Sequence, residues 1–218
     1  GAPPLYRPAE TQRFLLLSIF IGLFTGLVVV CFHAAIDVVG WYGADAAARY
    51  PPWGPVVLPG LGAGVAAALV LYVFRSARGS GINYTKAALY VSDGYIPSST
   101  VFGKFTACTI SLGSGNSLGP EDPALQMGAG VASALGRSFR LPREHLRLVA
   151  PVGAAAGLAA AFNTPITAVL FVIEEVIGAW NAAVLGSIVR SAVSVVVVSR
   201  SFRGDLAVIR VLARAAGH

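Results

Sequence analysis

Ser80 lies in a break between two apolar segments, where residues 79–83 read Gly-Ser-Gly-Ile-Asn. Glycines permit a tight turn and let backbone amides approach a ligand closely. A helix that starts here exposes unpaired N–H groups, and its dipole favours negative charge. Ser80 adds an uncharged hydroxyl donor. These residues can bind an anion, but for this segment taken alone an ordinary loop in which Ser80 caps the helix is the favoured interpretation.

Glu121 stands in a second break, where residues 117–123 read Ser-Leu-Gly-Pro-Glu-Asp-Pro before another apolar segment. We expect it in the first turn of a helix. A carboxylate within a membrane segment is costly and points to function. At a helix start that attracts anions, Glu121 can fill the anion site itself and leave when protonated or displaced, as a gate and proton carrier. The alternative is that Glu121 and Asp122 are first-turn acids at a solvent-exposed helix start.

A third segment is rich in small residues over 153–162, and Asn-Thr-Pro at residues 163–165 starts a new apolar helix. That helix ends in the adjacent acids Glu174 and Glu175. The two acids are either cytoplasmic-end residues or part of a proton route.

The segments that carry these residues are predicted to lie in a lipid bilayer. The chain of 218 residues is 56% hydrophobic and only 12% charged, whereas soluble domains carry about 25% charged residues. So few charges cannot cover a water-facing surface. The net charge of +6 comes from basic residues between apolar runs, with no basic stripe or interleaved aromatics, so we expect no nucleic-acid partner.

Two long spans are predicted first, at residues 14–39 and 55–74. At about 1.5 Å per residue each can cross a hydrocarbon core of about 30 Å. Residues 40–54, with two tryptophans and two adjacent prolines, are predicted to form an interfacial turn. Basic residues before the first span and after the second, at Arg75 and Arg78, place those ends in the cytoplasm.

The rest of the chain is divided into shorter apolar pieces. Broken helices at membrane depth often surround an ion or substrate site. We therefore predict an all-α integral membrane protein, a bundle of tilted and broken transmembrane helices. The predicted pieces are residues 82–91, 100–113, 121–136, 145–160, 165–178 and 180–200. Glycine pairs with a spacing typical of close helix packing are Gly22 with Gly26, Gly60 with Gly64, and Gly153 with Gly157.

Enzyme and metal chemistry are not expected. Cys31 and Cys108 lie in apolar stretches without a histidine pattern, so we expect buried packing residues rather than metal ligands. The three histidines have no neighbouring serine or cysteine motif of a hydrolase. No cofactor is predicted.

Taken together, the three segments resemble the CLC family of chloride channels and chloride/proton exchangers. Residues 79–82 match the first anion-site signature of that family. Residues 119–123, forty residues further on, resemble its gating-glutamate motif, Gly-Arg-Glu-Gly-Pro. Residues 155–165 and 171–175 are the most specific match. The resemblance extends from Arg13 to about Phe202, and implies the first of two inverted repeats of a cell-membrane protein.

The resemblance implies a role for each candidate residue. Ser80, with Gly81, is similar to the residues that coordinate the central chloride. Glu121 resembles the gating glutamate that changes places with anion and proton. Glu175 resembles the internal proton-transfer glutamate of exchangers, which favours chloride/proton antiport. Lys104 matches a basic residue before the gate, whose field would favour anions. A homodimer, or a chain that supplies the second half, is the implied protein partner.

The sequence departs from the family pattern in two ways. Pro120 replaces the arginine of the gating motif and Asp122 its second glycine, so we expect a weaker outer anion site and two acids that titrate as a coupled pair. The second repeat, with its coordinating tyrosine, has no counterpart here. The predicted division is a cytoplasmic segment at 1–12, the transmembrane repeat at 13–202, and a tail or start of a linker at 203–218. The alternative function is a non-conducting membrane scaffold or assembly subunit, or an inactive fragment.

Overall fold

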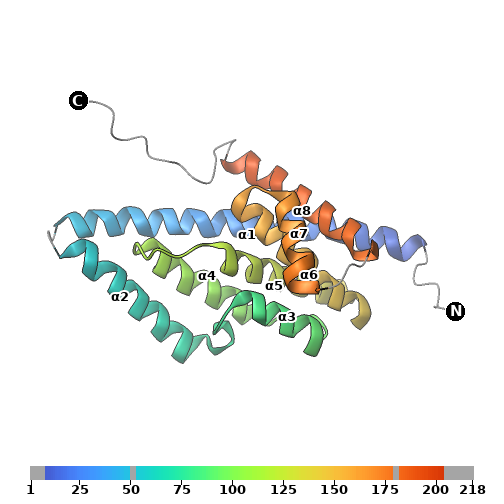
Figure 1. Ribbon diagram of the computed structural model, residues 1–218, viewed down its shortest axis with the longest axis horizontal. Helices are drawn as coiled ribbons and strands as arrows, with labels where there is room; N and C mark the ends of the chain where they lie inside the picture. The colour runs from blue at the N-terminus through green and yellow to red at the C-terminus, as the bar shows by residue number, and fades with distance from the viewer. Residues whose placement is uncertain (1–7, 50–52, 179–181, 204–218) are drawn as a thin grey trace.

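Helices make up the regular structure of this computed structural model, which describes residues 8–49, 53–178 and 182–203 (Figure 1). No strand occurs in these ranges, which confirms the predicted all-α class. Residues 1–7 and 204–218, parts of the predicted terminal segments, lie outside the described residues. The α-helices are α1 (Pro8–Arg49), α2 (Gly54–Ala68), α3 (Gly81–Val91), α4 (Ser98–Gly113), α5 (Glu121–Ser138), α6 (Arg143–Phe162), α7 (Pro165–Phe171) and α8 (Ala182–Arg203).

The predicted short pieces are confirmed as α3 to α8, with boundaries that shift by a few residues. Among the described residues, two π-helical turns extend helices and one 3₁₀ turn lies between two of them. α2 continues into the π-helical turn η1 (Leu69–Val73), and the 3₁₀ turn η2 (Arg75–Ala77) precedes α3. α7 continues into the π-helical turn η3 (Val172–Ile177), which carries the two adjacent acids. The turns η1 and η2 thus separate α2 from the start of α3.

The interfacial turn predicted from residue 40 is wrong over residues 40–49, because α1 continues to Arg49. Alanine-rich sequence after Gly43 supports the helix. The glycine serves close packing instead of a bend. A Cβ at Gly43 would lie 3.0 Å from the Leu58 side chain and 3.4 Å from the carbonyl oxygen of Gly113.

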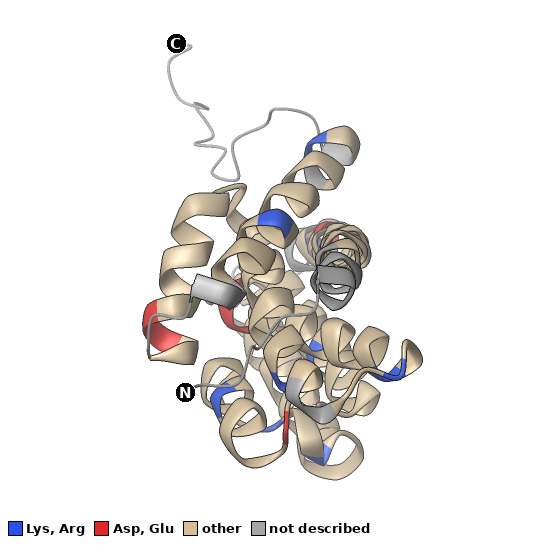
Figure 2. Cartoon of the chain, turned by 90° about the vertical axis from the view of Figure 1, so that its right-hand side faces the viewer, with Lys and Arg blue, Asp and Glu red and all other residues tan. Residues whose placement is uncertain are grey.

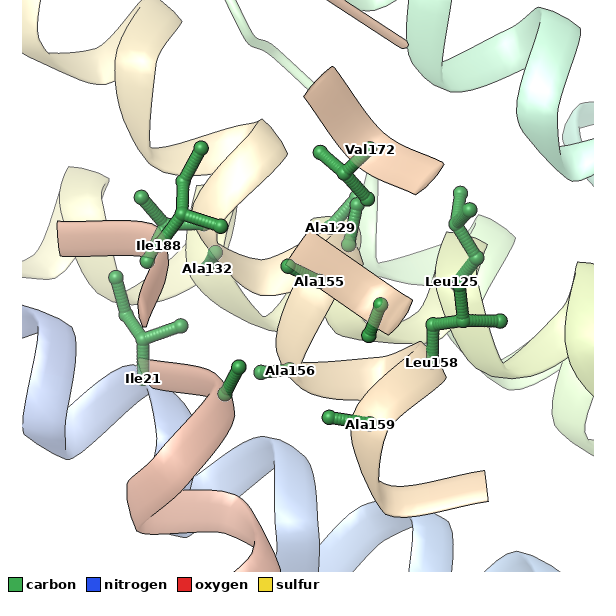
Figure 3. Close-up of a cluster of buried hydrophobic side chains, with 14 of the residues drawn as sticks. Ile21, Leu125, Ala129, Ala132, Ala155, Ala156, Leu158, Ala159, Val172 and Ile188 are labelled. Atoms are coloured by element: carbon green, nitrogen blue, oxygen red, sulfur yellow. The ribbon is translucent and has the colours of Figure 1, made fainter. Parts of the chain in front are cut away.

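α6 lies at the centre of the core, where its alanines face α1, α5 and α8 (Figure 3). Ala155, Ala156 and Ala159 are fully buried. Because their side chains are a single methyl group, the neighbouring helices approach closely and larger residues such as Ile188 fill the remaining space. The position of α5, and with it Glu121, is therefore set by contact with α6.

Two of the three predicted glycine pairs are packing sites. Cβ atoms at Gly22 and Gly26 would overlap side chains of α8, and those at Gly153 and Gly157 would overlap the backbone of α5. Gly60 and Gly64 make no such contact among the described residues, where nothing lies within 4 Å of a Cβ at either position. The glycine between them, Gly62, instead packs on Ser114, the residue that follows α4.

The outer surface of the bundle is apolar and carries few charged residues (Figure 2). Leu16–Asp45, Gly54–Val73 and His145–Phe162 are long and apolar enough to cross a membrane. Large side chains such as Phe24 and Val56 are exposed on α1 and α2. A water-facing surface of this kind would be unfavourable, so lipid or further protein covers it. Cys31, predicted to be buried, is also exposed, whereas Cys108 is half-buried.

Candidate anion-binding site

The N-terminus of α3 follows a tight turn at Gly79, whose φ of +77° is readily adopted only by glycine. Ser80 is the N-cap residue, with an extended backbone, and its Oγ accepts from the amide of Asn83 at 3.5 Å. The helix-cap interpretation of Ser80 is thus confirmed. The cap leaves the Ser80 hydroxyl proton and the amides of Gly81 and Ile82 available to a negatively charged group.

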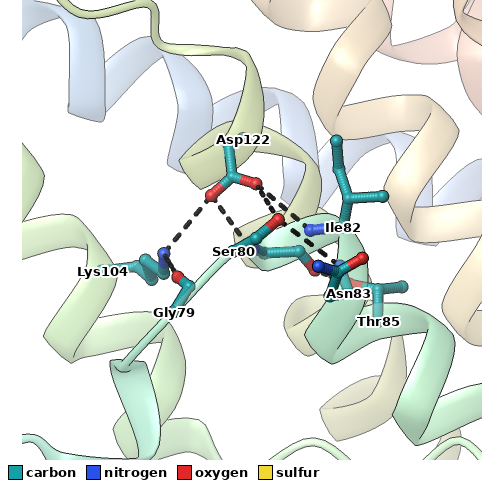
Figure 4. Close-up of polar contacts among 8 residues, drawn as sticks. Gly79, Ser80, Ile82, Asn83, Thr85, Lys104 and Asp122 are labelled. Atoms are coloured by element: carbon teal, nitrogen blue, oxygen red, sulfur yellow. Dashed lines mark hydrogen bonds and ion pairs between the residues drawn. The ribbon is translucent and has the colours of Figure 1, made fainter.

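The carboxylate of Asp122 takes up these donors (Figure 4). Its Oδ1 accepts from Ser80 Oγ at 3.0 Å and from the Ile82 amide at 3.2 Å. Its Oδ2 accepts from the Gly81 amide at 2.8 Å. A carboxylate bound by a hydroxyl and two amides at a helix start is stabilised both by charge-assisted hydrogen bonds and by the helix dipole.

Lys104 of α4 supplies the positive charge of the site. Its Nζ lies 3.3 Å from Asp122 Oδ2 and donates to the Gly79 carbonyl oxygen at 2.8 Å. Only 9% of the Lys104 side chain is exposed, so water screens its charge weakly. The sequence placed Lys104 near the gate; the structure shows its direct contact with the turn before α3.

Glu121 begins α5, is exposed, and folds back so that its carboxylate lies over Gly119. A Cβ at Gly119 would overlap that carboxylate, so glycine is required for this conformation. Glu121 and Asp122 both line a cavity of about 480 Å³ between α2, α4 and α5, with mainly apolar walls. The two neighbouring acids therefore have different surroundings: Asp122 contacts α3, and Glu121 faces the cavity.

Gln126, one turn after Asp122 on α5, is fully buried beside the start of α3. A Cβ at Gly81 would lie 2.8 Å from Gln126 Cβ and 3.0 Å from its Oε1. Within the described part of the chain, neither the amide oxygen nor the amide nitrogen of Gln126 has a hydrogen-bond partner. Sequence reasoning missed this residue, although its i, i+4 spacing from Asp122 puts the two on one helix face.

Glu175 lies apart from these residues, on η3. Its Oε2 forms an ion pair with Lys86 Nζ at 2.7 Å, with both side chains partly exposed. Lys86 is six residues after Ser80 on α3, about 9 Å along the helix axis. Tyr90 adds a hydrogen bond from its hydroxyl to the Ile177 carbonyl. The structure thus brings Ser80, Gly81 and Asp122 together, puts Glu121 on the adjoining cavity, and attaches Glu175 to the middle of α3.

Comparison with known proteins identifies the family of this chain. A model described as voltage gated chloride channel matches residues 62–216. The chain belongs to this family. CLC proteins are integral membrane proteins, in agreement with the apolar helices described above, and so is this chain. In the described residues, no group of three or more His, Cys, Asp or Glu side chains is arranged to hold a metal ion.

Named CLC relatives include channels and exchangers. A putative chloride channel protein ClcB-like of Ralstonia nicotianae is 34% identical over 201 residues, which cover 87% of this chain and 47% of the relative. An H(+)/Cl(-) exchange transporter ClcA of Vibrio cholerae is 33% identical over 207 residues, which cover 89% and 44%. The chain thus spans about half the length of the curated relatives it matches.

Solved CLC structures share the fold. The crystal structure of a slow cyanobacterial Cl⁻/H⁺ antiporter matches 91% of this chain and 49% of that protein, with a TM-score of 0.78 and 28% identity. The structure of a CLC-type fluoride/proton antiporter matches with a TM-score of 0.76 and 26% identity, over 91% of this chain and 49% of that one. The predicted family and architecture are therefore confirmed.

Proposed function

We propose that this chain forms half of a chloride pathway through a cell membrane, and that the assembled protein exchanges chloride for protons. The observation that carries the proposal is the binding of a carboxylate by Ser80 Oγ and the amides of Gly81 and Ile82, beside Lys104. Every group directed at that carboxylate is a donor or a cation. Such a site suits a small anion without a cofactor.

The candidate residues on the chloride and proton route have separate roles in this proposal. Ser80 and Gly81 bind the anion, and Glu121 acts as gate and proton carrier from the adjoining cavity. Glu175 passes protons at the other end of the route, held by Lys86. The remaining donors come from a second half, on another part of the polypeptide, another chain or a second copy in a homodimer. The names of the exchange transporter and the antiporter among the matches support coupled transport.

Chloride efflux from liposomes, with the external pH recorded, tests the proposal. We expect chloride release to be accompanied by proton movement in the opposite direction. Efflux equal to that of protein-free liposomes, with the second half supplied in trans, would contradict transport. It would favour the alternative of a non-conducting scaffold, for which the carboxylate of Asp122 at the anion site is the supporting observation.

The Glu175→Gln variant is expected to lower the proton flux at least about a hundredfold, since a positioned proton-transfer group contributes about 10²–10⁴-fold. The amide keeps the size of the side chain and cannot carry the proton. Glu174→Gln is the matched control, because Glu174 is the neighbouring exposed acid on η3. External pH recorded during efflux measures both variants. Equal proton fluxes in the two would remove Glu175 from the route.

A further inference from the structure

The carboxylate of Asp122 has the properties of a bound anion. It has one negative charge, two acceptor oxygens and four donors from two helices: the Ser80 hydroxyl and the Gly81 and Ile82 amides at the α3 start, and Lys104 of α4. Chloride accepts from the same kinds of donor. Since these donors are already occupied, an ion that enters must displace the carboxylate or bind elsewhere.

We propose that Asp122 is a tethered competitor of the transported anion, which gains access to Ser80, Gly81 and Lys104 only when the Asp122 side chain turns away. This inference rests on the proposed function and concerns the regulation of the same site. It differs from gating by Glu121, because Glu121 faces the cavity and makes none of these contacts.

Gln126 gives independent support. Its buried amide has a donor and an acceptor with no partner in the described residues, directly beside Gly81. Leaving such a buried group unsatisfied is unfavourable. A second arrangement of the site, in which the amide nitrogen donates to an entering anion, would remove part of that cost. The partnerless amide therefore indicates that the observed arrangement is one of two.

The adjoining cavity offers space for the displaced side chain. Asp122, Gly79 and Glu121 are among the residues that line it, and its volume is about 480 Å³. The Asp122 side chain is 30% exposed, so it can rotate without disturbing the core. Lys104 remains next to one negative charge in both arrangements, because the entering anion replaces the carboxylate.

Chloride binding to the purified protein in detergent, measured by isothermal titration calorimetry, tests the inference. Apparent affinity falls in proportion to the fraction of molecules in which the site is free. If the carboxylate fills the site at least nine-tenths of the time, Asp122→Gly and Asp122→Asn bind chloride at least about tenfold more tightly. Asp93→Asn, the same change at an exposed loop position, is expected to bind as the unmodified protein does.

Two further variants distinguish a failure of this inference from a failure of the proposed function. Should Asp122→Gly fail to fold, Asp122→Asn decides, because asparagine keeps the size of the side chain and removes the negative charge that competes with chloride. Ser80→Ala is made in the Asp122→Gly background, where no carboxylate competes, and is expected to weaken chloride binding about tenfold or more. Unchanged or weaker binding in both Asp122 variants, with the Ser80 effect intact, overturns the inference alone. If neither the Asp122 variants nor Ser80→Ala changes chloride binding, the proposed anion site is overturned as well.

Discussion

Glu121→Gln is expected to abolish proton movement coupled to chloride while chloride still flows. Glutamine keeps the shape and acceptor oxygen of the side chain, but it neither carries a proton at neutral pH nor bears the charge that competes with an anion. Glu121 and Asp122 both line the cavity next to the anion-binding residues, but the Asp122 carboxylate is held by the α3 donors, which leaves Glu121 as the acid that carries the proton. Proton flux should fall to the level of protein-free liposomes.

The measurement is external pH and chloride in the same liposome sample. Glu174→Gln removes the same charge from η3 and should leave both fluxes unchanged. A Glu121→Gln protein that still moves protons against chloride would show that the coupling acid lies elsewhere. Loss of both fluxes in a correctly folded variant would show that anion passage itself requires the Glu121 carboxylate.

The largest expected effect on stability is at Gly128, where α5 meets α6. A Cβ there would overlap the carbonyl oxygen of Gly153 and lie 3.0 Å from the Cα of Gly157. Both neighbours are backbone atoms, so no side chain can move aside. Gly128→Ala should therefore separate the two helices and lower the free energy of unfolding by about 1–3 kcal/mol, with a melting temperature lower by about 2–4 °C for each kcal/mol.

Gly60→Ala is the matched control, since no atom of the described residues lies within 4 Å of its added Cβ. Alanine is favoured over glycine in helices by about 1 kcal/mol, so this variant should melt at the same temperature or higher. Thermal unfolding in detergent micelles, followed by size-exclusion chromatography, compares the two. Equal melting temperatures would show that α5 and α6 are less tightly packed than the structure indicates.

Much of the helical framework was predictable because glycine and proline interrupt otherwise apolar sequence. The predicted pieces 82–91 and 121–136 coincide with α3 and α5 to within two residues. The same reasoning failed at residues 40–49, where glycine marks close packing and the alanines continue the helix. The sequence does not show whether a glycine bends the chain or allows two helices to pack closely, because close packing depends on a residue that lies far away in sequence.

The sequence predicted which residues belong to the candidate site, but only part of their spatial arrangement. Ser80 and Glu121 were recognisable because a hydroxyl and a carboxylate stand at breaks in apolar segments. The direction of the Asp122 side chain could not be predicted from the sequence, since its partners Gly81 and Lys104 are 41 and 18 residues away in sequence. Gln126 was missed because its buried amide follows from packing against α3, which no local pattern encodes.

The close approach at Gly81 and Gly128 bears on ion size. An added Cβ at Gly81 would lie 2.6 Å from the Asp122 carbonyl oxygen of α5, and one at Gly128 would overlap the Gly153 carbonyl oxygen of α6, so α3 lies close against α5 and α5 close against α6. The distance from Ser80 to the first turn of α5 can therefore widen only if three helices move together. An ion of larger radius meets a frame that does not expand, and we expect discrimination among halides to follow from this rigidity more than from the chemistry of any single donor.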